Sequence, residues 1–123
     1  MRVIAGSAKG RPLKAPAGMG TRPMTDRVKE SLFNILTVMG YPQEGDRVLD
    51  LYAGTGSLGI EALSRGAAWA DFVDYGNAPL PRILDNLAGT GLAGQGKAHQ
   101  MTVSAFLRLI RWSTFSATRR GGS

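Results

Sequence analysis

The chain has 123 residues, 43% of them hydrophobic, and a formal net charge of +6. That length and apolar content are typical of one modest folded domain. The absence of cysteine excludes disulfides and thiolate metal sites, and no apolar run is long enough to span a bilayer. We therefore expect a cytoplasmic protein with no metal and no membrane partner.

Positive charge is concentrated near the N-terminus, where residues 1–29 hold seven basic side chains and a single acid, Asp26. A basic segment ahead of a more acidic middle predicts a polyanionic partner such as RNA or DNA, although a solvated lysine-rich loop would give the same pattern. Residues 2–5 and 11–15 have the composition of short strands on either side of a turn at 6–10. This arrangement predicts a small β-hairpin arm.

A Gly/Pro-rich loop at 16–23 separates the arm from the first predicted helix, which Thr25 or Asp26 can cap. Gly40 and Pro42 are expected to end that helix. Apolar residues at helical spacing predict its buried face, with Phe33 also assigned to the core: Val28, Leu32, Ile35, Leu36 and Met39.

Strand and helix patterns alternate through the rest of the chain. Strands are predicted at 47–52, 69–74 and 98–103, and helices at 57–65, 79–87 and 105–112, with a loop at 89–96. This order implies a parallel sheet with right-handed crossovers, whose ligand lies beyond the carboxyl ends of the strands. The first strand is expected to be buried, Trp69 and Phe72 to pack within the sheet, and His99 to be solvated.

The run VLDLYAGTGSLGIE at 48–61 carries the main functional signal. A short apolar strand ends near Asp50, a turn follows with Gly54 and Gly56, and a helix opens at Ser57. The glycines match GxGxxG, and Asp74 follows about 20 residues later at the next strand end. This context predicts a nucleotide-like cofactor held at the turn.

The position of Asp50 distinguishes between two cofactors. An acid ahead of the glycines is unfavourable for a dinucleotide pyrophosphate but suits the cationic ammonium of S-adenosylmethionine, while Asp74 can accept hydrogen bonds from ribose hydroxyls. S-adenosylmethionine is therefore favoured, and an NAD-binding Rossmann domain stays open as an alternative.

Two separated segments resemble the bacterial RsmD family, which methylates the exocyclic N2 amine of a guanine in 16S rRNA. DLYAGTGSLGIEALSRGA is similar to its first cofactor motif, and MRVIAGSAKGRPLKAP followed by GTRPMTDRVKESLFNIL is similar to its opening hairpin, Arg-Pro-x-Thr-Asp-Arg segment and first helix. The resemblance covers about residues 1–107. It implies an α/β fold: a Rossmann-like class I S-adenosylmethionine-dependent methyltransferase sheet, N-terminal half only, preceded by the small β-hairpin arm.

The resemblance also implies site residues, a partner and a division of the chain. The cofactor-binding residues would be Asp50, Tyr52, Ala53, Gly54, Gly56, Asp74 and Tyr75, although Tyr75 could equally be a surface aromatic. The RNA-binding residues would be Arg2, Lys9, Arg11, Lys14, Arg22 and Arg27, with the rRNA of the small ribosomal subunit as partner. The arm would span 1–24, the methyltransferase part 25–112 and an aberrant, disordered tail 113–123.

The sequence departs from the family pattern in two places. Residues 101–104 contain no acid to contact the adenine, so a hydroxyl of Thr102 or Ser104 would have to substitute. The catalytic Asp/Asn-Pro-Pro-aromatic motif is missing, and no catalytic residue is assigned. A shifted reading frame over residues 113–120 can encode Asp-Leu-Leu-Gly-Asp-Pro-Pro-Trp, which leads to the hypothesis of a frameshift between about Ile110 and Ser113.

The missing motif changes what is expected of this chain. In the family the fourth strand pairs beside the first, so here the first strand would keep an open apolar edge. The full-length protein is expected to be a monomer, and this chain to be association-prone and inactive alone. A non-catalytic cofactor- or RNA-binding remnant, or a related enzyme acting on DNA or protein, are the other interpretations.

Overall fold

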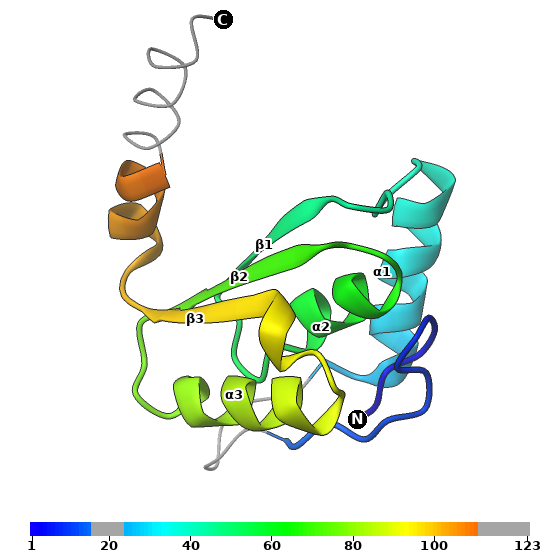
Figure 1. Ribbon diagram of the computed structural model, residues 1–123, viewed down its shortest axis with the longest axis horizontal. Coiled ribbons are helices and arrows are strands. Elements are labelled where there is room, and N and C mark those ends of the chain that lie inside the picture. Colours follow the sequence, from blue (N-terminus) through cyan, green and yellow to red (C-terminus); the bar gives the residue numbers. More distant parts are fainter. Residues whose placement is uncertain (16–23, 111–123) are drawn as a thin grey trace, which may run out of the picture.

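The computed structural model describes residues 1–15 and 24–110. Its centre is a sheet of three parallel strands in the order β1 (Arg47–Leu51), β2 (Trp69–Asp74) and β3 (Gly96–Gln100). Helices α2 (Ser57–Ser64) and α3 (Pro79–Gly89) connect successive strands and pack on the sheet (Figure 1). The predicted α/β architecture with a parallel sheet is confirmed, and the register places Asp50 beside Phe72 and Asp74 beside Gln100.

Most element boundaries agree with the sequence patterns. Helix α1 (Asp26–Val38) is capped by Thr25, whose Oγ1 accepts a hydrogen bond from the Val28 amide at 3.2 Å. The third strand was predicted too late in the chain. Leu92 is buried and the short helix η1 (Ala93–Gln95) tightens the connection, so β3 begins at Gly96 and ends at Gln100. Residues 103–110 are helical, and the predicted end of that helix lies outside the described residues.

The N-terminal arm, defined as residues 1–15, folds back on itself but is less regular than the predicted hairpin. One antiparallel bridge joins Arg2 and Pro12, flanked by bonds from the Val3 amide to the Arg11 carbonyl and from the Leu13 amide to the Met1 carbonyl. Pro12 occupies the position of this bridge whose amide would point away from the partner segment, so its missing amide hydrogen costs no bond here. The arm buries apolar side chains in the main core cluster: Val3, Ala8 and Leu13.

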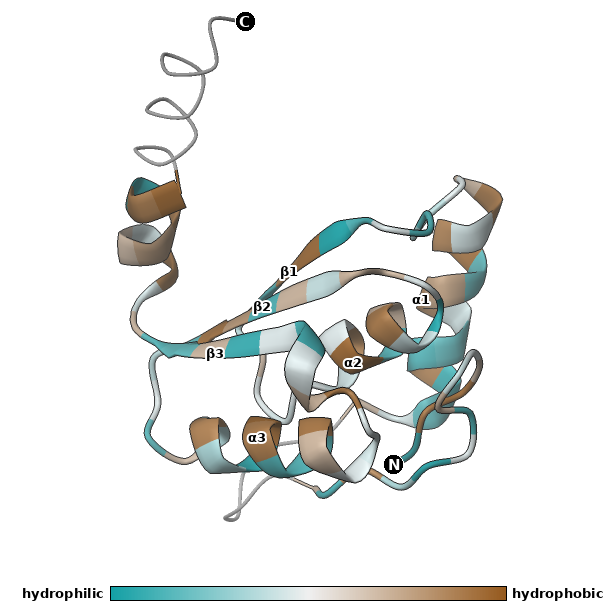
Figure 2. Ribbon diagram, viewed as in Figure 1, coloured by the Kyte–Doolittle hydropathy of each residue, from teal (hydrophilic) through white to brown (hydrophobic). Residues whose placement is uncertain are grey.

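The buried face of α1 differs in part from the predicted one. Phe33 is buried and Leu32 and Leu36 are half-buried, which agrees with the prediction. The other buried residue is Lys29, whereas Val28, Ile35 and Met39 are 54%, 60% and 63% exposed. Lys29 can be buried because its ammonium reaches buried acceptors, as described below. Figure 2 shows the resulting mixture of hydrophilic and hydrophobic segments along α1. Among the described residues, no helix is both long and apolar enough to cross a membrane.

Strand β1 lies at an edge of the described sheet, where it pairs with β2 alone. Its outer side borders a groove of about 660 Å³ that runs between the strand, α1 and α2. Leu49 is 39% exposed there, so the prediction that this strand is buried is wrong for the described residues. Within residues 1–15 and 24–110, the open apolar edge expected for the first strand is present.

His99 is not the solvated side chain that its polar surroundings predicted. Its Nε2 lies 2.8 Å from Oδ1 of Asp71, and its ring packs against Phe106 with 4.7 Å between ring centroids. The histidine side chain is only 15% exposed. Parallel pairing of β2 and β3 brings these residues together, although they are far apart in sequence. Phe72 is fully buried against α2, as predicted for strand packing.

Candidate functional site

The turn between β1 and α2 is built for close approach of a ligand. Tyr52 adopts a left-handed φ of 56°, which is uncommon for a non-glycine residue and concentrates at functional sites. The Gly56 amide bonds the Ala53 carbonyl at 2.8 Å, which closes the turn. Gly54 also has a positive φ, and a Cβ built on it would have no heavy atom within 4 Å. The backbone at Gly54 is therefore open to a ligand, whereas its conformation disfavours other residues.

Asp50 lies beneath this turn, near the end of β1. Its carboxylate Oδ2 accepts a hydrogen bond from the Gly59 amide at 3.0 Å, and the residue is only 7% exposed. Burial raises the pKa of Asp50 to about 7, the nearby charge of Asp74 adds to the rise, and the bond from Gly59 opposes it. A carboxylate held in this way gains most from a cationic partner, which would favour its charged form.

Asp74, at the end of β2, is hydrogen-bonded to the same turn. Its Oδ2 accepts from the Gly54 amide at 3.0 Å and its Oδ1 accepts from the Gly76 amide at 3.1 Å. Each carboxylate oxygen has a second lone pair, so the side chain holds the turn and retains capacity for hydroxyl donors. The structure thus brings together Asp50, Gly54, Gly56 and Asp74, which the sequence placed in one site.

A small polar pocket of about 260 Å³ lies next to Asp74 and is lined by Tyr75, Gly76, Asn77 and Gln100. Sequence reasoning did not single out Asn77 or Gln100, because the third strand was placed too late and its end was expected near Val103. Gln100 is the last residue of β3, and its amide donates to the Asn77 side chain. Tyr75 is 74% exposed at the rim of this pocket.

The two hydroxyls considered as substitutes for the missing acid have local partners. Thr102 Oγ1 accepts a hydrogen bond from the Ala105 amide at 3.1 Å, which caps the helical residues that follow. Ser104 Oγ lies 3.5 Å from the guanidinium of Arg108. Gln100 and Asn77 lie beside Asp74, and they are therefore better placed than either hydroxyl to contact the adenine of a cofactor.

The basic residues assigned to RNA have mixed surroundings. Arg2 pairs with Asp26 at 3.5 Å and Lys14 pairs with Asp85 at 3.2 Å, both at the surface. Arg11 reaches the Gly89 carbonyl at 3.4 Å. Lys9 and Arg27 are exposed, and Arg22 lies outside the described residues. Exposed ion pairs are worth only about 0–1 kcal/mol, so phosphate oxygens can compete for these side chains.

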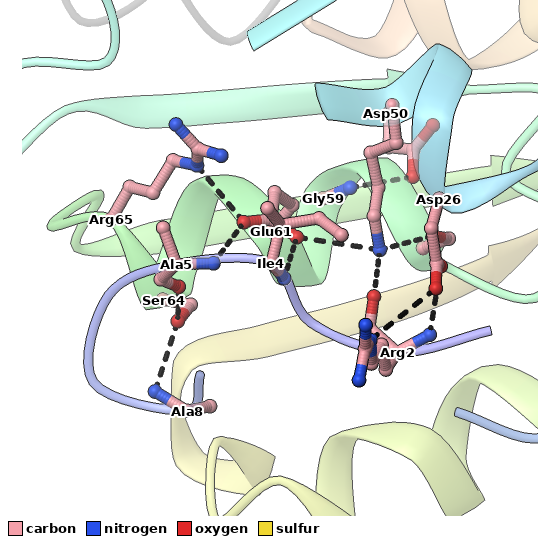
Figure 3. A network of polar contacts seen from close by, with 12 residues as sticks. Arg2, Ile4, Ala5, Ala8, Asp26, Asp50, Gly59, Glu61, Ser64 and Arg65 are labelled. Atoms are coloured by element: carbon pink, nitrogen blue, oxygen red, sulfur yellow. Dashed lines mark hydrogen bonds and ion pairs between the residues drawn. The ribbon is translucent and has the colours of Figure 1, made fainter. Parts of the chain in front are cut away.

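A buried ionic cluster around Glu61 of α2 was missed from the sequence. Glu61 accepts hydrogen bonds from the Ile4 and Ala5 amides at 2.9 and 3.1 Å and from Arg65 Nε at 2.9 Å, and it lies 3.3 Å from the Lys29 ammonium. Figure 3 shows Glu61 between the arm and Arg65. Lys29 is fully buried, so its charge does not belong to the basic surface inferred for residues 1–29. Glu61 and Lys29 lie 32 positions apart, and no local pattern links them.

Comparison with known proteins matches residues 1–115 to the family described as Conserved hypothetical protein 95. YlbH of Bacillus subtilis (strain 168) is 55% identical over 87 residues, which are 71% of this chain and 46% of YlbH. Ribosomal RNA small subunit methyltransferase D of Escherichia coli (strain K12) is 40% identical over 107 residues, 87% of this chain and 52% of that protein. The chain therefore spans about half the length of the curated relatives it matches.

Solved structures show the same fold. Hypothetical protein TTHA0928 of Thermus thermophilus superposes with a TM-score of 0.74 at 32% identity, covering 98% of this chain and 63% of that one. An RNA methyltransferase from Salinibacter ruber, solved in complex with S-adenosyl-L-homocysteine, gives a TM-score of 0.57 at 21% identity, covering 66% and 50% of the two chains. The predicted Rossmann-like methyltransferase sheet is confirmed at the level of fold.

Proposed function

The chain belongs to the Conserved hypothetical protein 95 family, the RsmD family that its motifs resemble, and from this membership we propose that it is the cofactor-binding part of an rRNA methyltransferase. The enzyme transfers a methyl group from S-adenosylmethionine to the exocyclic N2 amine of a guanine in 16S rRNA. One observation carries the proposal: Asp50 and Asp74, at the ends of neighbouring parallel strands, flank an open glycine turn.

The donor set fits S-adenosylmethionine. Asp50 supplies a buried carboxylate for the ammonium, Asp74 keeps lone pairs for ribose hydroxyls, and the backbone at Gly54 leaves room for the ligand. The pocket lined by Tyr75, Asn77 and Gln100 offers polar groups for the adenine edge. When bound, the cofactor supplies an activated methyl group; these residues bind and orient it. Asp74 could hold a ribose of NAD in the same way, but the pyrophosphate of NAD would meet the Asp50 carboxylate at the turn, which disfavours NAD.

The substrate-facing side of the proposal rests on charge. Arg2, Lys9, Arg11, Lys14 and Arg27 of the described residues provide basic groups for RNA phosphates, together with Arg22. Salt should weaken RNA binding by this chain steeply, because phosphate contacts release counterions. The family's catalytic Pro-Pro motif is not in this sequence, so we propose that the 123-residue chain binds cofactor without turning over.

The first expected result is selective cofactor binding. Calorimetric titration of the chain with S-adenosylhomocysteine is expected to give saturable binding with a Kd in the micromolar range, which corresponds to a binding free energy on the order of −8 kcal/mol. Titration with NADH is expected to give no binding. Binding of NADH with no response to S-adenosylhomocysteine would refute the cofactor assignment in favour of a dinucleotide domain.

Methyl transfer from labelled cofactor to immature small subunits is expected to stay at background, and incorporated label would contradict the claim of inactivity.

We further propose that this chain self-associates through the β1 edge. In the described part of the chain β1 pairs on one side only, and Leu49 is 39% exposed beside the groove. An apolar strand edge of this kind recruits other chains. Leu49→Lys is expected to shift the protein toward monomer in light scattering coupled to size exclusion, because a charge on the edge opposes pairing. Leu84→Lys, at a residue 52% exposed on α3, is the matched control and should change nothing. A wild-type chain that stays monomeric at high concentration would rule this out.

A further inference from the structure

Two buried side chains connect the N-terminal arm to the turn that flanks the candidate cofactor site. The first is Lys29 of α1, which is fully buried. Its ammonium donates to the Arg2 carbonyl at 2.6 Å and to Ser57 Oγ at 3.0 Å. Ser57 is the first residue of α2 and follows directly on Gly56. A single side chain thus links the beginning of the arm to the helix end that completes the turn.

The second connection is Asn86 of α3, which is 2% exposed. Its Oδ1 accepts from the Lys14 amide at 2.7 Å, and its Nδ2 donates to the carbonyls of Lys14 at 3.2 Å and Thr55 at 2.9 Å. Thr55 lies between the two glycines of the turn. Asn86 therefore links the end of the arm to the middle of the turn, as Lys29 links its beginning to Ser57.

Both connections make the conformation of the turn depend on the arm. If the arm leaves its place, the Lys29 ammonium and the Asn86 amide each lose a buried partner, and buried polar groups without partners cost about 1–3 kcal/mol each. The Lys29 ammonium keeps Glu61 and Ser57, and the Asn86 amide keeps the Thr55 carbonyl. Water that reaches the vacated space then competes for both side chains and weakens their hold on Ser57 and Thr55. The conformation of the turn is thereby tied to the docking of the arm.

We propose that Lys29 and Asn86 are positioning residues that make cofactor affinity depend on docking of the N-terminal arm. The inference rests on the proposed cofactor site and adds to it a link with the basic arm, which carries Arg2, Lys9, Arg11 and Lys14. Because coupling between two binding events is reciprocal, a bound cofactor also stabilises the docked arm. The cofactor site and the basic surface therefore respond to each other through two buried side chains.

The arm can be displaced without altering either positioning residue. Gly6 packs against the end of α2 with a positive φ of 86°, and a Cβ at this position would lie 1.8 Å from the Ser64 carbonyl oxygen. The neighbouring Ser7 amide bonds the same carbonyl at 2.7 Å. Gly6→Ala must therefore shift the arm away from α2, while Lys29, Asn86 and the turn keep their own sequence.

The test compares S-adenosylhomocysteine affinity by calorimetry in matched variants. Asn86→Ala and Gly6→Ala are each expected to weaken binding about 10-fold, within the 5- to 150-fold range typical of coupling between sites. Asp85→Ala is the control, because Asp85 also joins Lys14 to α3 but does not reach the turn; its affinity should match that of the wild type. Equal affinity in wild type, Asn86→Ala and Gly6→Ala would overturn the proposal.

Hydrogen exchange on the wild-type chain gives a readout that needs no variant to fold. Saturation with S-adenosylhomocysteine is expected to slow exchange of the Ile4, Ala5 and Lys14 amides, which bond Glu61 and Asn86. Unchanged exchange at these amides under saturation would overturn the coupling while leaving the cofactor site intact. No binding by the wild type would instead refute the proposed function, and the coupling with it.

Discussion

Glu61→Ala is expected to lower the free energy of unfolding by about 3–5 kcal/mol, the usual cost of removing one partner of a buried ion pair. The substitution removes the carboxylate that balances the charge of the Lys29 ammonium, which is fully buried 3.3 Å from it. Burial already lowers the pKa of Lys29, and the Glu61 carboxylate opposes that shift by stabilising the charged form. The Ile4 and Ala5 amides lose their acceptor as well.

Chemical denaturation followed by circular dichroism measures this loss. Glu30→Ala is the matched control, since Glu30 is an exposed acid one position from Lys29 on α1 and its removal should change stability by no more than about 0.5 kcal/mol. Glu61→Gln should fall between the two, because its amide oxygen can still accept one arm amide. A Glu61→Ala chain as stable as Glu30→Ala would show that the cluster does not hold the arm.

Asp50→Asn is expected to stabilise the free protein at pH 8 and to weaken its cofactor binding, two effects of opposite sign. The pKa of Asp50 is raised from 3.8 to about 7 in the folded chain. Between these values the native state holds a proton that the unfolded state has released, so the free energy of unfolding falls as pH rises from about 4 to 7. Asparagine removes that loss, on the order of 2–4 kcal/mol above pH 7.

Binding should respond in the opposite direction. Loss of a charge-assisted bond to the ammonium costs about 1.5–3 kcal/mol, or roughly 10- to 100-fold in affinity for S-adenosylhomocysteine at pH 8. For the wild type near pH 7, binding is expected to release on the order of half a proton, visible as a dependence of the calorimetric enthalpy on the buffer. Asp85→Asn serves as the control. An Asp50→Asn chain that binds as tightly as the wild type would remove Asp50 from the site.

The cofactor turn could be predicted from the sequence because its signals are local. Asp50, Gly54 and Gly56 lie within seven consecutive residues, between an apolar strand and a helix start, and Asp74 marks the next strand end. The residues that give the turn its chemistry are therefore recognisable from their spacing within one short segment of the sequence. The structure adds that Asp74 bonds the Gly54 amide, which a pattern of residue types cannot reveal.

Features that depend on distant contacts were not predictable in the same way. The predicted face of α1 was only partly right, because a pattern of apolar residues treats Lys29 as exposed. Its ammonium is instead buried with Glu61, Ser57 and the Arg2 carbonyl as partners. His99 was misassigned for the same reason, since its partner Asp71 comes from another strand. The third strand was displaced because the compact turn at 93–95 left no strong signal.

The arm also has a consequence for how the chain reaches its native state. Its hydrogen bonds to the core join residues separated by 56 positions at Ala8 and Ser64 and by 72 positions at Lys14 and Asn86. The arm precedes in sequence the elements that it binds, so it leaves the ribosome before the surface of α2 and α3 on which it docks has formed. Val3, Ala8 and Leu13 are buried in the core cluster only after the helices that complete it have been synthesised. The arm is synthesised first but is therefore among the last segments to dock. Until then, the nascent chain exposes a basic, partly apolar arm that can bind other molecules.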